Sequence, residues 1–133
     1  MSSQSSYSVF IVLGALILFI ATLLGAYGTH GVQGSVNEQA WNAYQVAVEY
    51  QFYHGIGVIL VGILTLNFSK SKWIKASGWL LFFGVLVFSG SIYTVTLAGI
   101  SGGSALAPIG GLSMMGGWLA LAYGVLRLSL IHI

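Results

Sequence analysis

The sequence predicts an all-α integral membrane protein, a four-helix bundle with a short amphipathic extracytoplasmic helix between its first two spans. Of its 133 residues, 57% are hydrophobic and only 5% are charged, whereas a soluble domain carries roughly 25% charged residues. The mean hydropathy is +0.94. Four apolar stretches are each near the ~20 residues that a helix needs to cross ~30 Å of hydrocarbon. The length fits a single membrane domain over residues 1–133.

The four predicted spans cover about residues 7–28, 50–68, 76–99 and 107–128. None has a charged residue in its middle, and Leu, Ile, Val and Phe occur all round each helix, as expected when lipid is the solvent. The segment Met1–Tyr7 lacks the basic region of a secretory signal. We therefore expect the first apolar stretch to be a retained membrane helix.

The cations predict the orientation in the membrane. Lys70, Lys72 and Lys75 lie between the second and third spans, and Arg127 closes the fourth. The other two connections, residues 29–49 and 100–106, contain no Lys or Arg. By the positive-inside rule, both termini are expected in the cytoplasm, with the protein in a bacterial inner membrane.

The first outer connection carries its own helix signal. Ser35 and Glu38 have the S-x-x-E spacing of a capping box, which predicts Ser35 as N-cap and Val36 as the first helical residue. One polar stripe then follows at helical spacing: Glu38, Asn42, Gln45 and Glu49. We expect an interfacial helix that runs into the second span.

The last six residues raise a separate question. Residues 128–133, Leu-Ser-Leu-Ile-His-Ile, match one reading frame of a transposase sequencing adaptor. We expect that this tail does not belong to the natural protein, and the coding DNA would decide the matter. His132 is therefore left out of any candidate site.

The residue inventory excludes several kinds of chemistry. The chain has no cysteine, which excludes disulfides, thiolate catalysis, iron–sulfur clusters and Cys-based zinc sites. It also has no aspartate, so Ser–His–Asp catalysis is not supported, and we assign no catalytic residue and no metal site. A pI of 9.1 arises from four basic and two acidic side chains, too few for a basic patch, so nucleic acid is not expected as a partner. The cofactor, if any, stays unknown.

Small residues at helical spacing predict close helix packing. They lie in the first and fourth spans: Ala21, Gly25, Gly110, Gly111, Gly116, Ala120 and Gly124. Such seams let the backbones of membrane helices approach closely, within the bundle or between copies. A groove that fits a ligand is the alternative interpretation.

Polar residues gather toward one side of the predicted bundle. With the orientation above, the following lie in the outer half of the membrane: His30, Glu49, Tyr50, Gln51, His54, Ser89, Ser91 and Tyr93. His54 is expected about one turn below the interface, where it needs a hydrogen-bond partner, and His30 is the nearest candidate. The cluster could be a pocket for a headgroup, a quinone, a metal or a proton. The structural interpretation is the one we favour, because such side chains bond across membrane helices at ~0.6 kcal/mol each.

Five motifs occur together in order: Gly25–Gly31 (GAYGTHG), Trp41–Glu49, Tyr50–Gly55 (YQFYHG), Phe88–Tyr93 (FSGSIY) and Ala107–Gly111 (APIGG). In this combination the chain, from about Val12 to Tyr123, resembles the uncharacterised inner-membrane family that includes bacterial YgdD and small animal transmembrane relatives. The family's usual GAFGAH appears here as GAYGTH. The resemblance implies four helices and membrane residence but no established activity. Its motifs fall on His30, Tyr50, Gln51, His54, Ser89, Gly90, Pro108 and Gly110.

Three functions are compatible with these features. The one we favour is a non-enzymatic accessory, assembly or lipid-interacting protein, whose partners are the lipid bilayer and a second copy or another membrane protein. A small transporter or channel is the second, although the first span lacks the glutamate on which four-helix exporters depend, so His54 would have to titrate. A quinone- or metal-binding membrane subunit, using the pocket around His30 and His54, is the third.

Overall fold

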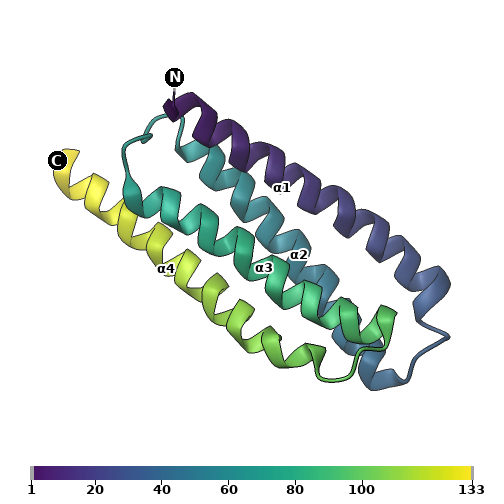
Figure 1. Cartoon of the computed structure of the whole chain (residues 1–133). Coiled ribbons are helices and arrows are strands. Elements are labelled where there is room, and N and C mark those ends of the chain that lie inside the picture. The colour runs from purple at the N-terminus through teal and green to yellow at the C-terminus, as the bar shows by residue number, and fades with distance from the viewer. Residues whose placement is uncertain (1, 133) are drawn as a thin grey trace.

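The computed structural model describes the backbone of residues 2–132 and the side chains of residues 9–131. Four long helices, α1 (Ser2–Tyr27), α2 (Glu38–Leu64), α3 (Lys72–Ala98) and α4 (Ala107–His132), are joined by short connections. These connections include the π-helical turn η1 (Gly28–Val32) and the 3-10 turn η2 (Gly103–Leu106). The helices follow one another across the molecule in chain order (Figure 1), and extensive interfaces join α1 to α2, α2 to α3 and α3 to α4. The predicted all-α four-helix bundle is confirmed.

All four helices are long and apolar enough to cross a membrane. The segments with this property are Val9–Val32, Glu38–Leu64, Lys72–Ala98 and Gly103–Ile131. Large aliphatic side chains point outward from them; Leu119 is 72% exposed and Leu112 is 65% exposed. Such a surface suits a hydrocarbon solvent and not water.

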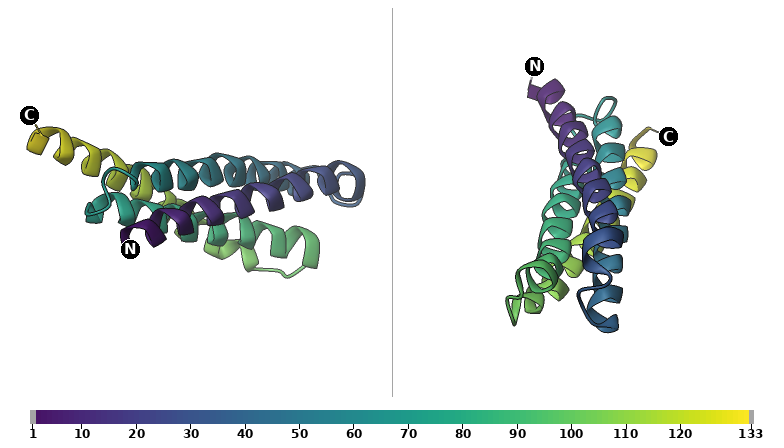
Figure 2. Two further views of the ribbon diagram at one scale, coloured as in Figure 1. Left: turned by 90° about the horizontal axis from the view of Figure 1, so that it is seen from above. Right: turned by 90° about the vertical axis from the view of Figure 1, so that its right-hand side faces the viewer.

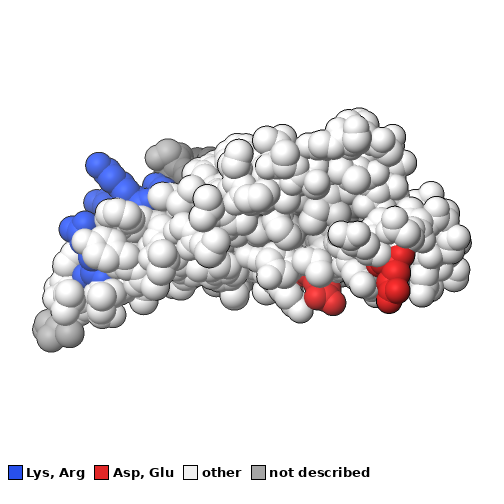
Figure 3. All heavy atoms as spheres, turned by 90° about the horizontal axis from the view of Figure 1, so that it is seen from below, with Lys and Arg blue, Asp and Glu red and all other residues white. Residues whose placement is uncertain are grey.

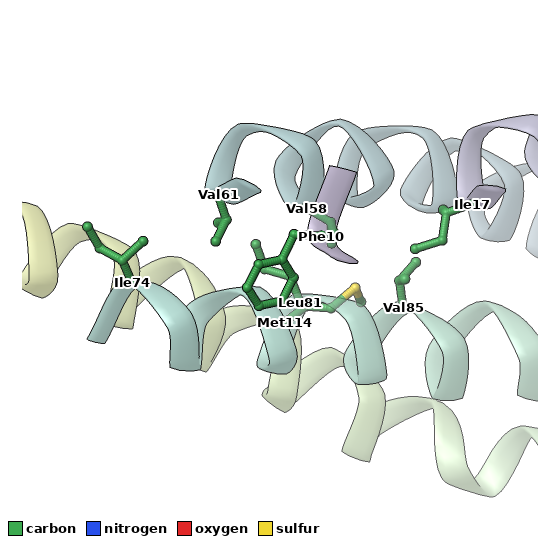
Figure 4. Packing of buried hydrophobic residues seen from close by; sticks show 8 residues of the cluster. All are labelled: Phe10, Ile17, Val58, Val61, Ile74, Leu81, Val85 and Met114. Carbon is green, nitrogen blue, oxygen red and sulfur yellow. The ribbon is translucent and has the colours of Figure 1, made fainter. Parts of the chain in front are cut away.

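Every helix contributes to one apolar core. Figure 4 shows its buried members: Phe10 and Ile17 from α1, Val58 and Val61 from α2, Ile74, Leu81 and Val85 from α3, and Met114 from α4. Because lipid tails are as apolar as these side chains, their burial adds little hydrophobic free energy, and packing contacts carry more of the stability. Close approach of the helices therefore contributes directly to the stability of this fold.

Glycines allow that close approach at two helix crossings. A Cβ atom added to Gly110 of α4 would lie 2.4 Å from the backbone nitrogen of Phe88 and 2.7 Å from the carbonyl oxygen of Gly84 on α3. A Cβ added to Gly14 of α1 would lie 2.8 Å from the carbonyl oxygen of Gly55 on α2. At both crossings backbone meets backbone, so only glycine fits.

The predicted packing residues divide into two groups. Ala21 and Ala120 are buried, and Gly110 and Gly124 lie against α3. In contrast, Gly111 has space around it, while Cβ atoms on Gly116 and Gly25 would meet only single side chains at 3.9 and 3.6 Å. The contact on α4 in fact repeats every seven residues, through Gly110, Gly117 and Gly124. A four-residue spacing turns by about 40° at each step and leaves the interface, whereas a seven-residue spacing drifts by only about 20°.

The predicted start of the outer helix is wrong by two residues. Asn37, not Ser35, is the N-cap of α2, because its backbone is extended and its side-chain oxygen accepts from the Ala40 backbone N–H at 2.8 Å. The Ser35 hydroxyl instead donates to the carbonyl oxygens of Gly31 and Val32, at 3.1 and 3.0 Å. Ser35 therefore completes the π-helical turn that ends the first span.

The interfacial helix does not exist as a separate element. Residues 38–64 form one continuous helix, and its first three turns pack along α1. Tyr44 is fully buried and donates its hydroxyl proton to the carbonyl oxygen of Leu24. A Cβ on Gly25 would lie 3.6 Å from Val48. The segment that carries the polar stripe thus packs beside the last turns of α1, and the stripe itself stays exposed.

The fourth helix extends past its neighbours at one end. Figure 2 shows the C-terminal turns of α4 projecting beyond α2 and α3. The α-helix continues to His132, so the suspected adaptor-derived tail is helical in this structure. Its origin stays a prediction.

Candidate functional site

Gln51 is the centre of the polar cluster. Its side chain is buried, its Nε2 donates to the carbonyl oxygen of Ile17 at 3.0 Å, and its Oε1 accepts from the Tyr93 hydroxyl at 2.6 Å. These two bonds join α2 to α1 on one side and to α3 on the other. Both ends of the amide are therefore used in holding three helices together.

Serine and tyrosine hydroxyls add further links. Ser89 of α3 donates to the Ala47 carbonyl oxygen of α2 at 2.7 Å. The Tyr44 ring packs against that of Tyr93, with centroids 5.5 Å apart. Ser91, by contrast, donates to Phe88 within its own helix at 2.8 Å. The network thus joins α1, α2 and α3 through side chains bonded to backbone carbonyl oxygens.

His54 is held by two hydrogen bonds in a defined protonation state. The Trp118 indole N–H of α4 lies 3.0 Å from His54 Nε2, and His54 Nδ1 lies 2.8 Å from the Tyr50 carbonyl oxygen. Because an indole nitrogen only donates, Nε2 must accept, and Nδ1 must carry the proton that it donates to Tyr50. The imidazole is therefore neutral, with its proton on Nδ1.

Trp118, and not His30, is the partner of His54. His30 is exposed in the π-helical turn after α1, whereas His54 is buried. A Cβ on the neighbouring Gly55 would lie 2.8 Å from both Ile17 and Leu18, about 15 Å along α1 from its end at Tyr27. His54 is thus near mid-depth of the bundle. Its depth below the membrane interface stays a prediction.

The candidate residues therefore divide into a buried group and an exposed group. Gln51, His54, Ser89 and Ser91 are buried, and Tyr93 is half-buried beside them. Glu49 and His30 are exposed, and Tyr50 is 38% exposed with its ring stacked on Phe88. The structure does not bring His30, Glu49 and His54 together around one cavity. Sequence reasoning missed Trp118, although it stands alone as a hydrogen-bond donor in the middle of the fourth span.

The hydrogen bonds of the polar cluster are better suited to hold the helices together than to bind a ligand. Among the described side chains, no buried polar atom lacks a hydrogen-bond partner. The described residues also contain no group of three His, Cys, Asp or Glu side chains suited to a metal ion. A ligand, proton or metal at His54 Nε2 would first have to displace Trp118. A transporter using this histidine as its titrating group would have to break the same bond.

We expect Trp118→Phe to change the environment of His54 without unfolding the protein. The substitution keeps an aromatic ring but removes the donor, leaving Nε2 without a partner, at a cost of about 1 kcal/mol. ¹⁵N NMR of the histidine ring in the parent protein should show a protonated Nδ1 and a hydrogen-bonded, unprotonated Nε2. The Nε2 resonance should shift in Trp118→Phe and stay in place in Trp79→Phe, because Trp79 lies among Phe10, Phe82 and Phe83. A parent protein with its proton on Nε2 contradicts the assignment.

The comparison with known proteins places this chain among small bacterial membrane proteins without assigned activity. The family described as "Protein of unknown function (DUF423)" matches residues 24–111. A UPF0382 membrane protein of Staphylococcus haemolyticus is 42% identical over 112 residues, which is 84% of this chain and 90% of that protein. The UPF0382 membrane protein YwdK of Bacillus subtilis is 33% identical over 119 residues, with 90% and 97% covered. No solved structure matches the chain.

Proposed function

Because the chain belongs to the DUF423 family of membrane proteins of unknown function, we propose that it is a non-enzymatic accessory or assembly protein of the bacterial inner membrane. Its partner is a second copy or another membrane protein, and it docks on the polar stripe of α2. The buried polar groups of the cluster serve to fix the bundle, as their shared hydrogen bonds suggest. The residues available for recognition are therefore those left exposed.

The exposed carboxylate of Glu49 carries this proposal. Its neighbour Val48 lies at the level of Gly25, two residues before the end of α1, so Glu49 lies about 4.5 Å below the outer end of α1. Its side chain is exposed at that depth, on the same stripe as exposed Asn42 and Gln45. A charged side chain toward hydrocarbon is costly, about 2.5–3.5 kcal/mol at mid-membrane, and less near the interface. A partner that covers the stripe would remove this cost.

Within the part of the chain that the structure describes, no Lys or Arg is positioned to neutralise Glu49. The four Lys and Arg residues lie at one end of the molecule, and the two glutamates lie toward the other (Figure 3). An electrostatic partner for the carboxylate must therefore come from another molecule. A Lys, Arg or hydroxyl group on a neighbouring membrane helix has the required chemistry.

The same separation of charge supports an orientation with both termini in the cytoplasm. Cations next to membrane spans are retained on the cytoplasmic side. The end that carries Lys70, Lys72, Lys75 and Arg127 is also the end at which α1 begins and α4 finishes. The relatives in Staphylococcus and Bacillus are named as membrane proteins, which supports a bacterial membrane as the location.

Photo-crosslinking from the stripe tests the assembly role. The chain has no cysteine, so Gln45→Cys provides a single thiol on the stripe for a benzophenone maleimide, and Leu119→Cys provides one on the lipid-facing side of α4. We expect Gln45→Cys, illuminated in native membranes, to give one discrete protein adduct that Leu119→Cys does not give. An adduct of twice the 14.1 kDa chain mass would identify a second copy.

The effect of replacing Glu49 on the adduct yield distinguishes specific binding of a partner from random contacts in the membrane. In the Gln45→Cys background, Glu49→Gln should reduce the adduct at least about fivefold, and Glu49→Asp should retain most of it. The proposal fails if Gln45→Cys and Leu119→Cys crosslink to the same set of proteins. It also fails if the yield of the adduct is unchanged in Glu49→Gln.

A further inference from the structure

A hollow with basic walls lies at the opposite end of the molecule from Glu49. Its volume is about 670 Å³, and it opens between the α2–α3 connection, the start of α3 and the last turns of α4. Lys70 and Lys72 line one side, and Arg127 lines the other. Three of the four Lys and Arg side chains thus line one cavity, from the α2–α3 connection, the start of α3 and the end of α4.

The cations of the hollow have no carboxylate side chain near them. The only acidic side chains of the sequence are Glu38 and Glu49, and Figure 3 shows them toward the other end. Three positive charges that converge on a cavity repel one another unless an anion is bound between them. A bound anion between these side chains would relieve that repulsion.

Aromatic contacts fix one wall of the hollow. The Trp73 and Tyr123 rings meet edge to face with centroids 4.7 Å apart, and the Arg127 guanidinium lies 6.0 Å from the Tyr123 ring centroid. A Cβ on Gly124 would lie 2.9 Å from the Trp73 Cβ, so α4 and α3 are in close contact here. The exposed Arg127 guanidinium thus lies beside this aromatic pair at the rim of the hollow. The cations and Trp73 all precede residue 128, so the cavity's charge is independent of the suspected tail.

We propose that this hollow binds the phosphate of an anionic phospholipid headgroup from the cytoplasmic leaflet. Phosphate oxygens match both a guanidinium and two ammonium groups. Trp73 is a residue type that occurs at headgroup level, and Phe68, which also lines the hollow, provides an apolar surface on which the acyl chains can lie. The site does not depend on the assembly role proposed above, because it uses different residues at the other end of the bundle.

Native mass spectrometry of the full-length protein in a neutral detergent tests the site. The protein is titrated with phosphatidylglycerol and, separately, with phosphatidylcholine. We expect one phosphatidylglycerol to be retained in preference to phosphatidylcholine, and Arg127→Gln to weaken that retention about fivefold. Lys75→Gln is the matched control, since it removes one charge at the same end from a residue that does not line the hollow. It should bind as the parent does.

The variants and a competitor separate the alternatives. Equal weakening by Lys75→Gln and Arg127→Gln would mean that surface charge alone attracts the lipid, and it would overturn the proposal. Displacement of the lipid by millimolar inorganic phosphate would show that the acyl chains contribute nothing, and it would overturn the lipid assignment. Equal binding of the two lipids would do the same. If Arg127→Gln fails to fold, Arg127→Lys and Lys72→Gln replace it, with retention expected in the first and loss in the second.

Discussion

Replacing Gly110 with alanine should cause the largest loss of stability of any single-methyl addition considered. The new Cβ would lie 2.4 Å from the Phe88 backbone nitrogen and 2.7 Å from the Gly84 carbonyl oxygen, and backbone atoms cannot rotate away as a side chain can. The α3–α4 interface would have to separate, at a cost of ~1–3 kcal/mol or more. Unfolding in mixed detergent with increasing SDS, followed by circular dichroism, measures this cost as a lower midpoint.

Gly111→Ala provides the matched control for this experiment. It adds the same methyl group one residue later on the same helix, at a position with nothing within 4 Å. Alanine favours a helix over glycine by up to ~1 kcal/mol, so the midpoint should stay the same or rise. Equal losses in Gly110→Ala and Gly111→Ala would mean that the close α3–α4 crossing does not determine stability.

The sequence predicted the number of long helices and their apolar surfaces, which follow from the membrane environment. Four apolar stretches free of central charge can only be membrane spans, because a chain with so few charged residues cannot cover itself in water. The resemblance to an uncharacterised membrane family is confirmed by the relatives. The seam of small residues on the fourth span was recognised, but its register was not. Which of the neighbouring Gly116 and Gly117 faces α3 depends on the crossing angle, which no single helix encodes.

The full length of the second helix was not recognised from the sequence. Residues 38–49 carry four polar side chains on one face, which lowers the apolar signal of the segment and suggests an interfacial helix. Its opposite face, however, presents Tyr44 and Ala47, both fully buried in the bundle. A helix can span a membrane with a polar stripe when its other side is packed against neighbours. The partner of His54 was missed for a related reason, since Trp118 is distant in sequence and reaches α2 only after α3 and α4 have packed together.

Tyr44→Ala should destabilise the protein by ~3–5 kcal/mol, the range for deleting a fully buried aromatic side chain. The ring is 1% exposed, stacks near Trp41, packs on Tyr93, and its hydroxyl donates to the Leu24 carbonyl oxygen. Its loss would leave a cavity between α1, α2 and α3. The same SDS titration would report the change, and Tyr44→Phe should retain most of the stability, since it deletes only the hydroxyl group.

Tyr53→Ala on the same helix is the control that makes this result decisive. Tyr53 is 56% exposed and faces away from the core, so its deletion should alter the free energy of unfolding by no more than about 0.5 kcal/mol. If residues 38–49 formed a peripheral helix lying on the membrane, Tyr44→Ala would be as mild as Tyr53→Ala. A difference of several kcal/mol between the two is expected only if residues 38–49 pack against α1 as part of the bundle, with Tyr44 buried and the Glu49 side chain left exposed on another face of α2.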